Sequence, residues 1–425
     1  MKFYRYPDKK YWAEIIQRPV VDNSSLKKTI KKIVQKVKDN GDKAVRKYSK
    51  EFDGVKLKLL AVTEKEINAA QTLLPDELKQ AIQQAKRNIE SFHASQKEEV
   101  KKIETMPGVI CWRQSVAIEK IGFYIPGGSA PLFSTVLMLA IPAQIAGCNE
   151  IILCTPPLKD RTIHPAILYA AQLCGITKIF KAGGVQAIAA MAYGTKSIPK
   201  VFKIFGPGNQ YVTLAKQFVQ QLGVAIDMPA GPSELLVIAD DTVVPEYVAA
   251  DLLSQAEHGP DSQVVLLTTN EEFAKKVILC VNIQQESLPR KDITQLALEN
   301  SKVVIVKDIE EAIALSNFYA PEHLILACDN AEEMTDKIIS AGSVFLGNYS
   351  PESAGDYASG TNHTLPTNGY AAMYSGVSLD SFVKKITFQQ LTKEGLENIS
   401  HTVMTMAAAE GLDAHKMAVA IRIKN

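Results

Sequence analysis

The most constraining feature of this chain is a repeated alternation between short apolar runs and longer stretches with helical periodicity. From about residue 116 onward, runs rich in β-branched residues are followed by Gly or Pro and then by a helical stretch. Continuous apolar strands that alternate with helices are typical of parallel sheets covered on both faces. The chain is therefore expected to be an α/β protein, with strands near 121–125, 151–154, 178–181, 201–205, 235–239, 264–268, 303–306, 324–327 and 344–346.

These strands are more than one doubly wound domain usually contains, so the sequence predicts two parallel-sheet domains, each an incomplete Rossmann-like fold. The split is placed near residue 234. Residues 121–234 form one domain. The other comprises 235–375 together with 25–120, while 1–24 is an N-terminal extension. The helical part of 25–120, from Ser25 to about Gln96, is expected to pack on the second sheet.

The last segment, residues 376–425, has helical periodicity but is too short for a core of its own. A segment of this kind must dock on another surface. We expect that surface to belong either to its own body or to a second subunit.

Composition excludes several classes of partner. The chain carries 47 Lys+Arg against 46 Asp+Glu in 425 residues, so no basic excess is available to hold nucleic acid by counterion release. No apolar stretch reaches the ~18–20 residues of a membrane span, and the N-terminus lacks the apolar core of a signal peptide. The six cysteines show no CxxC spacing and are expected to be reduced. We therefore expect a soluble, cytoplasmic protein without a nucleic-acid or membrane partner.

Histidine is scarce, and four of the seven histidines lie in short polar clusters. In the first cluster, Gln255 and His258 close a helix that stops at Gly259-Pro260. Their i,i+3 spacing places both side chains on one helix face, beside a loop that a ligand can reach. A single His at a helix C-terminus is more often a capping or dipole partner, so a metal role needs further ligands.

The second cluster is Glu322-His323, where an acid and an imidazole stand side by side as a strand begins. Such a pair offers two titratable groups with separable tasks, one activating water and the other moving a substrate proton. Taken alone, the pair is better explained as a surface salt bridge.

Two more clusters follow. Asp356 and His363 lie in a long segment, 347–366, rich in Gly, Ser, Asn and Pro, and a loop of that length in a compact α/β protein is usually functional or disordered. Glu410 and His415 flank a helix break at Gly411 in the tail. The plain interpretation of the tail pair is helix capping, yet a His in a docking tail could complete a site built by another chain.

Gln255, His258, Asp356 and His415 together make a nitrogen and oxygen ligand set without cysteine. Imidazole and carboxylate suit zinc, or failing that manganese or cobalt, and the absence of thiolate favours a catalytic site over a structural one.

Gly-rich turns that follow strands are compatible with a nucleotide-binding site. They occur at Gly127-Gly128, at Gly183-Gly184 before Gln186, and at 206–209, where Asn209 opens a helix. Such turns let a backbone approach a phosphate at a helix N-terminus. The dinucleotide fingerprint GxGxxG is absent, because Tyr211 stands at the third glycine position, and glycines that serve only the turns remain an alternative.

In combination these motifs resemble the histidinol dehydrogenase family. The resemblance rests on ordered stretches that cover about 300 residues, namely YIPGG from Tyr124, GPGN from Gly206, IDMPAGPSE ending at Glu234, 251–258, APEH ending at His323, GDY from Gly355, TNH ending at His363 and 410–415.

The resemblance implies a zinc-dependent oxidation of L-histidinol to L-histidine through a bound aldehyde, with reduction of two NAD+. It implies one zinc per subunit and a homodimer with exchanged tails, in which His415 and Glu410 serve the partner's site. Residue by residue, it implies zinc ligands at Gln255, His258, Asp356 and His415 and an acid/base pair at Glu322 and His323. It implies that the substrate contacts Ser233, His363 and Glu410, as well as the four zinc ligands and His323. It implies NAD contacts at Tyr124, Gln186 and Asn209.

Two other functions fit the residues taken without the resemblance. A metal beside a Glu–His pair also describes a zinc hydrolase that activates water. A non-catalytic metal-binding protein with purely structural glycine turns is the other alternative.

Overall fold

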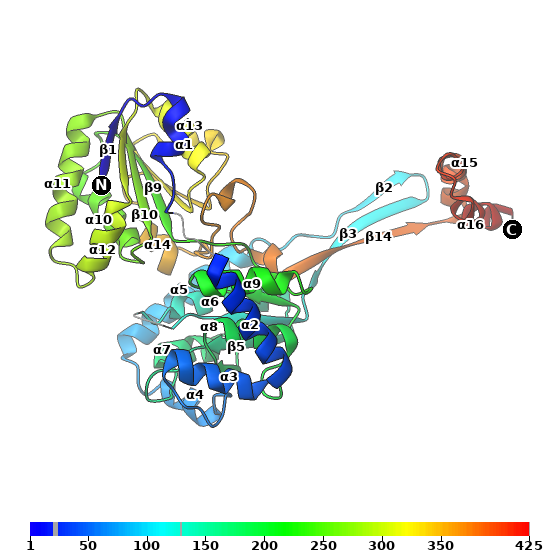
Figure 1. The fold of residues 1–425 in the computed structure, drawn as a ribbon. Helices are drawn as coiled ribbons and strands as arrows, with labels where there is room; N and C mark the ends of the chain where they lie inside the picture. Colours follow the sequence, from blue (N-terminus) through cyan, green and yellow to red (C-terminus); the bar gives the residue numbers. More distant parts are fainter. Residues whose placement is uncertain (20–23, 128–129, 425) are drawn as a thin grey trace.

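The computed structural model describes residues 1–19, 24–127 and 130–424. Two parallel sheets, each enclosed by helices, form the body, and an arm of strands and helices extends from it (Figure 1). The predicted fold class is therefore confirmed. Within the described residues, no helix combines the length and apolar character needed to cross a membrane.

The first sheet contains six parallel strands in the order β1-β11-β10-β9-β12-β13. Its inner strands are buried on both faces, which explains their continuous apolar sequences. One face packs on α10, α11 and α12, and the other packs on α1, α13 and η3. The strands are β1 (Lys2–Arg5), β9 (Glu234–Ala239), β10 (Gln263–Thr268), β11 (Lys302–Ile305), β12 (His323–Ala327) and β13 (Ser343–Leu346), and the helices are α1 (Trp12–Ile15), α10 (Pro245–Ala256), α11 (Glu271–Gln285), α12 (Lys291–Glu299), α13 (Ile309–Tyr319) and η3 (Ala331–Lys337).

The second sheet contains five parallel strands in the order β6-β5-β4-β7-β8. Helices α4, α5, α6 and α7 cover one face, and α2, α3, α8 and α9 cover the other. The strands are β4 (Lys120–Tyr124), β5 (Glu150–Thr155), β6 (Lys178–Lys181), β7 (Lys203–Phe205) and β8 (Ala225–Ile226), and the helices are α2 (Ser24–Asn40), α3 (Asp42–Tyr48), α4 (Glu64–Ala70), α5 (Asp76–Ala94), α6 (Phe133–Ala146), α7 (Pro165–Leu173), α8 (Gly184–Tyr193) and α9 (Gln210–Gln220).

The helices between residues 24 and 94 lie on the five-stranded sheet, so the expectation that the helical block packs on the six-stranded sheet is wrong. Ile82 and Ile89 of α5 belong to the same core cluster as α6, and Ile30 and Val34 of α2 belong to that of α8. The physical reason is that α6 is apolar on all sides and buried from Ser134 to Ala143. Such a helix needs a second helix over its outer surface, and α5 supplies it.

The two chain ends also depart from the expected extensions. The N-terminal segment, of which 20–23 lie outside the described residues, contributes strand β1 to the six-stranded sheet. The C-terminal tail is not wholly helical, because β14 (Val383–Leu391) joins β2 (Lys102–Met106) and β3 (Val109–Ala117) in an antiparallel sheet ordered β14-β3-β2. Helices α15 (Lys393–Ala409) and α16 (Asp413–Lys424) lie at the far end of this arm (Figure 1).

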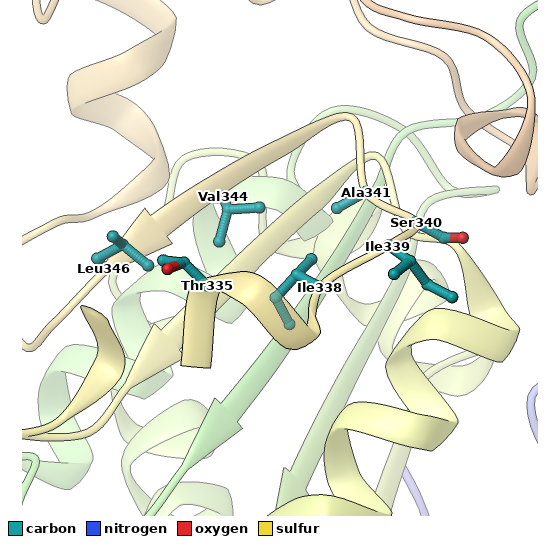
Figure 2. Close-up of a pocket in the computed structure, with 7 residues that line it drawn as sticks. All are labelled: Thr335, Ile338, Ile339, Ser340, Ala341, Val344 and Leu346. Carbon is teal, nitrogen blue, oxygen red and sulfur yellow. The ribbon is translucent and has the colours of Figure 1, made fainter. Parts of the chain in front are cut away.

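An apolar hollow of about 240 Å³ lies beside the edge strand β13, at Thr335, Val344 and Leu346 (Figure 2). Three further lining residues are Ile338, Ile339 and Ala341, and the remaining one is Ser340. None of the seven is titratable, so this hollow is separate from the chemistry described next.

Candidate active site

The candidate active site lies at the amino ends of strands β9 and β12. Glu234 begins β9, His323 begins β12, and the two strands are neighbours with His323 opposite Leu235. Helix α10 runs antiparallel to its preceding strand and brings Gln255, its penultimate residue, back to this edge. The segment after β13 reaches the same place through α14 (Glu352–Tyr357), a helix inside what the sequence suggested to be a continuous loop.

His323 is buried, and its two ring nitrogens have different surroundings. Nδ1 lies 3.3 Å from the Glu234 carbonyl oxygen, while Nε2 lies 3.8 Å from Asp356 Oδ1 and has no hydrogen-bond partner among the described residues. Burial, together with the nearby His258 and His363, lowers the pKa of His323 to about 3, and the contact with the Glu234 carbonyl opposes this shift. The ring is therefore neutral, and the Nδ1 contact places the proton on Nδ1 and leaves Nε2 as an acceptor.

Glu322 is buried beside this imidazole, with a carboxylate oxygen 3.7 Å from His323 Nδ1. The Glu234 backbone N–H donates to the same oxygen at 3.0 Å. Burial raises the pKa of Glu322 well above its usual range, and the charges of Glu234 and Asp356 act in the same direction. The pair thus combines a carboxyl group that holds a proton with an imidazole that can accept one.

A cluster suited to a metal ion adjoins the pair. One ligand atom each from His258, Glu352 and Asp356 lies within 4.8 Å of the others. Burial raises the pKa of Asp356 to about 6, and the adjacent His258 opposes that shift. Imidazole and carboxylate ligands suit zinc, and a divalent cation would offset the charge that these carboxylates carry when ionised. The residues present therefore fit a metal ion.

Gln255 is fully buried next to this cluster, and the acceptors around it favour the amide orientation in which its nitrogen donates to the Glu352 carboxylate at 3.1 Å. The amide oxygen is left for another partner. His258 lies just beyond the end of α10 and is exposed in the single chain, so the cluster is open on that side.

Glu352 is the main site residue that the sequence analysis missed. Its carboxylate lies 3.6 Å from His323 Nδ1 and also accepts from Gln255. Burial raises its pKa well above the usual range, and Asp356 and Glu322 raise it further. A signal was available, because Pro351 followed by Glu352 predicts a helix start and the i,i+4 spacing to Asp356 places both carboxylates on one face.

His363 joins the site to the other sheet's domain. Its Nδ1 lies 2.9 Å from the Asp356 backbone oxygen, and its Nε2 lies 3.1 Å from the Thr135 hydroxyl on α6. Burial lowers its pKa to about 4. Ser233 is half-buried and directly precedes Glu234, and its carbonyl accepts from the Gln263 backbone N–H at 3.2 Å. Both residues therefore lie at the amino edge of the six-stranded sheet.

The three residues considered for NAD lie at carboxyl ends of strands in the five-stranded sheet. Tyr124 ends β4, its hydroxyl accepts from the Gly184 N–H at 3.1 Å, and burial raises its pKa to about 12. Gln186 is buried and its amide oxygen has no partner in the part of the chain that the structure describes, while Asn209 caps α9.

The glycine turns also serve packing. A Cβ on Gly206, whose φ is +125°, would lie 2.0 Å from the Tyr124 carbonyl oxygen. This glycine is therefore required by the fold, whatever it binds. Gly128 of the first turn lies outside the described residues.

Glu410 and His415 are not brought to the site within one chain. Both are exposed at the far end of the arm, which projects away from the body (Figure 1). The expected fourth ligand, His415, is thus remote from His258 and Asp356 of its own chain.

The body consists of two α/β domains, each built on a parallel sheet, and a buried Glu–His pair lies beside a cluster of metal-ligating side chains. These features define a class of α/β enzyme that uses acid/base chemistry next to a metal. Comparison with known proteins specifies the family. Residues 16–423 match the histidinol dehydrogenase family, and the chain belongs to it.

Individual relatives agree with this assignment over the whole chain. The histidinol dehydrogenase of Bacteroides thetaiotaomicron is 62% identical over 423 residues, covering 100% of this chain and 99% of the relative. That of Escherichia coli (strain K12) is 54% identical over 413 residues, covering 96% and 94%. The crystal structure of histidinol dehydrogenase from Elizabethkingia anophelis superposes with a TM-score of 0.98 at 61% identity, covering 100% of this chain and 98% of that chain.

Proposed function

We propose that the protein oxidises L-histidinol to L-histidine through bound L-histidinaldehyde and reduces two NAD+ in the process, which are the final steps of histidine biosynthesis. The single observation that carries this proposal is the full-length match to the histidinol dehydrogenase family. The Glu322–His323 pair beside the metal-type cluster supports it, since an alcohol-to-acid conversion needs acid/base groups at two stages.

His323 is suited to act as the base. Its neutral ring presents an unpartnered Nε2, which can accept the hydroxyl proton as hydride leaves the alcohol carbon for NAD+. Glu322 is suited to donate a proton to the aldehyde oxygen as water adds to the carbonyl carbon, because burial favours its protonated form, and it regains the proton that the added water releases. The hydrate then loses its one carbon-bound hydrogen as hydride to the second NAD+ and a hydroxyl proton to base, which yields the carboxylic acid, and this acid loses a further proton to give the carboxylate.

Gln255, His258 and Asp356 of one subunit, together with His415 contributed by the other, would hold one zinc per subunit. Zinc would supply a template for the imidazole and amine of the substrate and a share of Lewis acidity. The support for this site is the cluster at His258 and Asp356, together with the Gln255 amide that Glu352 orients.

Substrate and cofactor contacts follow the same proposal. Ser233 and His363 lie at the edge where the reacting groups gather, and Glu410 adds a carboxylate for a cationic substrate. Tyr124, Gln186 and Asn209 would contact NAD. The unpartnered amide oxygen of Gln186 supports this, since a buried polar atom of that kind gains a hydrogen bond when a ligand arrives.

We further propose a cytoplasmic homodimer with exchanged arms, in which Glu410 and His415 reach the partner's site. The arm leaves several apolar side chains exposed, and a second copy would cover them. These side chains are Ile103, Met106, Met406, Leu412, Met417 and Ile421. All six cysteines are free thiols, which fits a reducing compartment.

One incubation tests the proposed activity. Zinc-loaded protein is mixed with L-histidinol and NAD+, and NADH and histidine are measured together. We expect two NADH for each histidine formed. A zinc hydrolase or a passive metal-binding protein predicts neither product, so absence of both with folded, metal-loaded protein would overturn the proposal.

A further inference from the structure

The N-terminal segment reaches the candidate active site through one side chain, that of Arg18. Its guanidinium makes a bidentate pair with the buried carboxylate of Glu234, with Nε 2.5 Å from Oε1 and Nη2 2.9 Å from Oε2. Bidentate geometry fixes the orientation of both partners. The pair is therefore a defined structural link between a segment distant in sequence and the first residue of β9.

Glu234 contacts both candidate catalytic residues through its backbone. Its N–H donates to Glu322 Oε2 at 3.0 Å, and its carbonyl oxygen lies 3.3 Å from His323 Nδ1. The first contact fixes the carboxyl group. The second sets the tautomer that leaves Nε2 of His323 as the acceptor. A rotation of the Glu234 peptide units would disturb both groups together.

Arg18 also holds the chain that leads into His323. Its Nη2 donates to the carbonyls of Tyr319 at 2.6 Å and Ala320 at 3.3 Å, and the guanidinium stacks on the Tyr319 ring at 3.9 Å. Ala320 has a φ of +51°, in the left-handed region that few residues other than glycine adopt. Only Pro321 separates this turn from Glu322, so Arg18 anchors the starts of β9 and β12 at once.

We propose that Arg18 and Glu234 form a positioning pair that orients Glu322 and His323 for the reaction without touching the substrate. This inference rests on the proposed function and adds two residues to it. The pair acts through hydrogen bonds to backbone atoms, so its loss misplaces Glu322 and His323 while leaving the metal-type cluster and His363 in place.

The test compares Arg18→Met, which keeps an unbranched apolar chain beside Tyr319 but removes the guanidinium, with Glu234→Gln, which keeps shape and loses charge. We expect kcat to fall roughly 10²-fold in each, because small misplacements of reacting groups carry costs of that order. The KM for L-histidinol and the zinc content should stay near wild type. The Arg18→Ala variant should regain turnover when guanidinium ion is added, since the ion can occupy the vacated space.

Arg5→Met is the matched control. Arg5 lies in the same N-terminal segment and makes a bidentate pair with Glu271, but both side chains are at the surface far from the site. Its kcat should equal that of the wild type. Unchanged kcat in Arg18→Met and Glu234→Gln would overturn the inference. The inference would also be overturned if turnover fell only in proportion to a loss of zinc or of folded protein and if guanidinium did not restore it.

Crystal structures of the wild type and the two variants separate this inference from the proposed function. We expect the contact between the Glu234 carbonyl and His323 Nδ1 to be lost or lengthened in both variants. Unmoved Glu322 and His323 would overturn the inference even if the enzyme oxidises histidinol. Wild-type protein that forms no NADH would overturn the proposed function and leave the structural comparison valid. If Arg18→Met fails to fold, Arg18→Lys serves in its place.

Discussion

At the scale of single residues, the proposed function assigns metal binding and proton transfer to different side chains. His258 belongs to the metal-type cluster, whereas His323 presents its free Nε2 beside that cluster and has a hydrogen-bonded Nδ1. The two histidines are both close to Asp356 and differ in what surrounds them. Their substitution should therefore damage different properties of the same enzyme.

We expect His258→Ala to lower bound zinc with the fold intact, and His323→Ala to retain zinc while turnover falls roughly 10²–10⁴-fold, the usual cost of removing a general base. Elemental analysis and steady-state kinetics on both variants give the comparison, with circular dichroism to confirm folding. His164 is a suitable control, because its ring caps the start of α7 on the five-stranded sheet. Full zinc content in His258→Ala, or near-normal turnover in His323→Ala, would contradict the assigned role.

At the scale of elements, the segment that carries Asp356 and His363 is held by helices of the other domain. Asn88 on α5 donates to the Ala358 carbonyl at 2.7 Å, and Asn362 donates to the Met138 carbonyl on α6 at 2.6 Å. The buried His93 ring on α5 lies 3.3 Å from the Asn362 amide. Helices α5 and α6 therefore clamp the segment 358–363 next to the site.

Gly360 allows the close approach that this clamp needs. Its φ is +117°, and a Cβ there would lie 2.8 Å from the Asn88 carbonyl oxygen. We expect Gly360→Ala to displace the segment at a cost of about 1–3 kcal/mol. Because His363 moves with it, the KM for L-histidinol should rise about 10-fold, a change of ~1.4 kcal/mol.

The control for this substitution is Gly223→Ala. Gly223 also has a positive φ, +88°, but a Cβ there meets nothing within 4 Å. It should lower the thermal midpoint without changing KM. If Gly223→Ala raised the KM as much as Gly360→Ala does, backbone strain, and not the clamp, would account for the higher KM.

The same elements show what sequence reasoning could and could not supply. The expected strands and the pairing of Glu322 with His323 at a strand start depend on local patterns, and the structure contains them. The placement of α5 depended on which sheet needed a second helical layer, which is a long-range packing property. Strand β14 was missed because its side chains are mostly exposed within one chain, so it carries no buried-face pattern.

At the scale of the whole molecule, the arm is the part that a single chain does not explain. Nine residues of β14 pair with β3, yet the helices that they carry project from the body with apolar side chains exposed. The cluster at His258 is open on one side, and His415 of the same chain is remote from it. Arm exchange in a two-fold dimer would satisfy both features with one contact.

Hybrid dimers test this exchange directly. We expect His415→Ala and His323→Ala homodimers to be inactive, and their mixture to recover activity after subunit exchange. In a hybrid, the body with intact His323 receives the partner's intact His415, so one of its two sites is complete. Random exchange makes about half of the dimers hybrid, which predicts about a quarter of wild-type activity.

The control mixes His258→Ala with His323→Ala. Both of these residues lie in the body of one chain, so this hybrid has a defect in each of its two sites and should remain inactive. Exchange is verified by mass spectrometry of differently tagged subunits. Verified hybrids of the first pair that stay inactive would place His415 in its own chain's site, and the arm would then have to fold back onto the body that carries it.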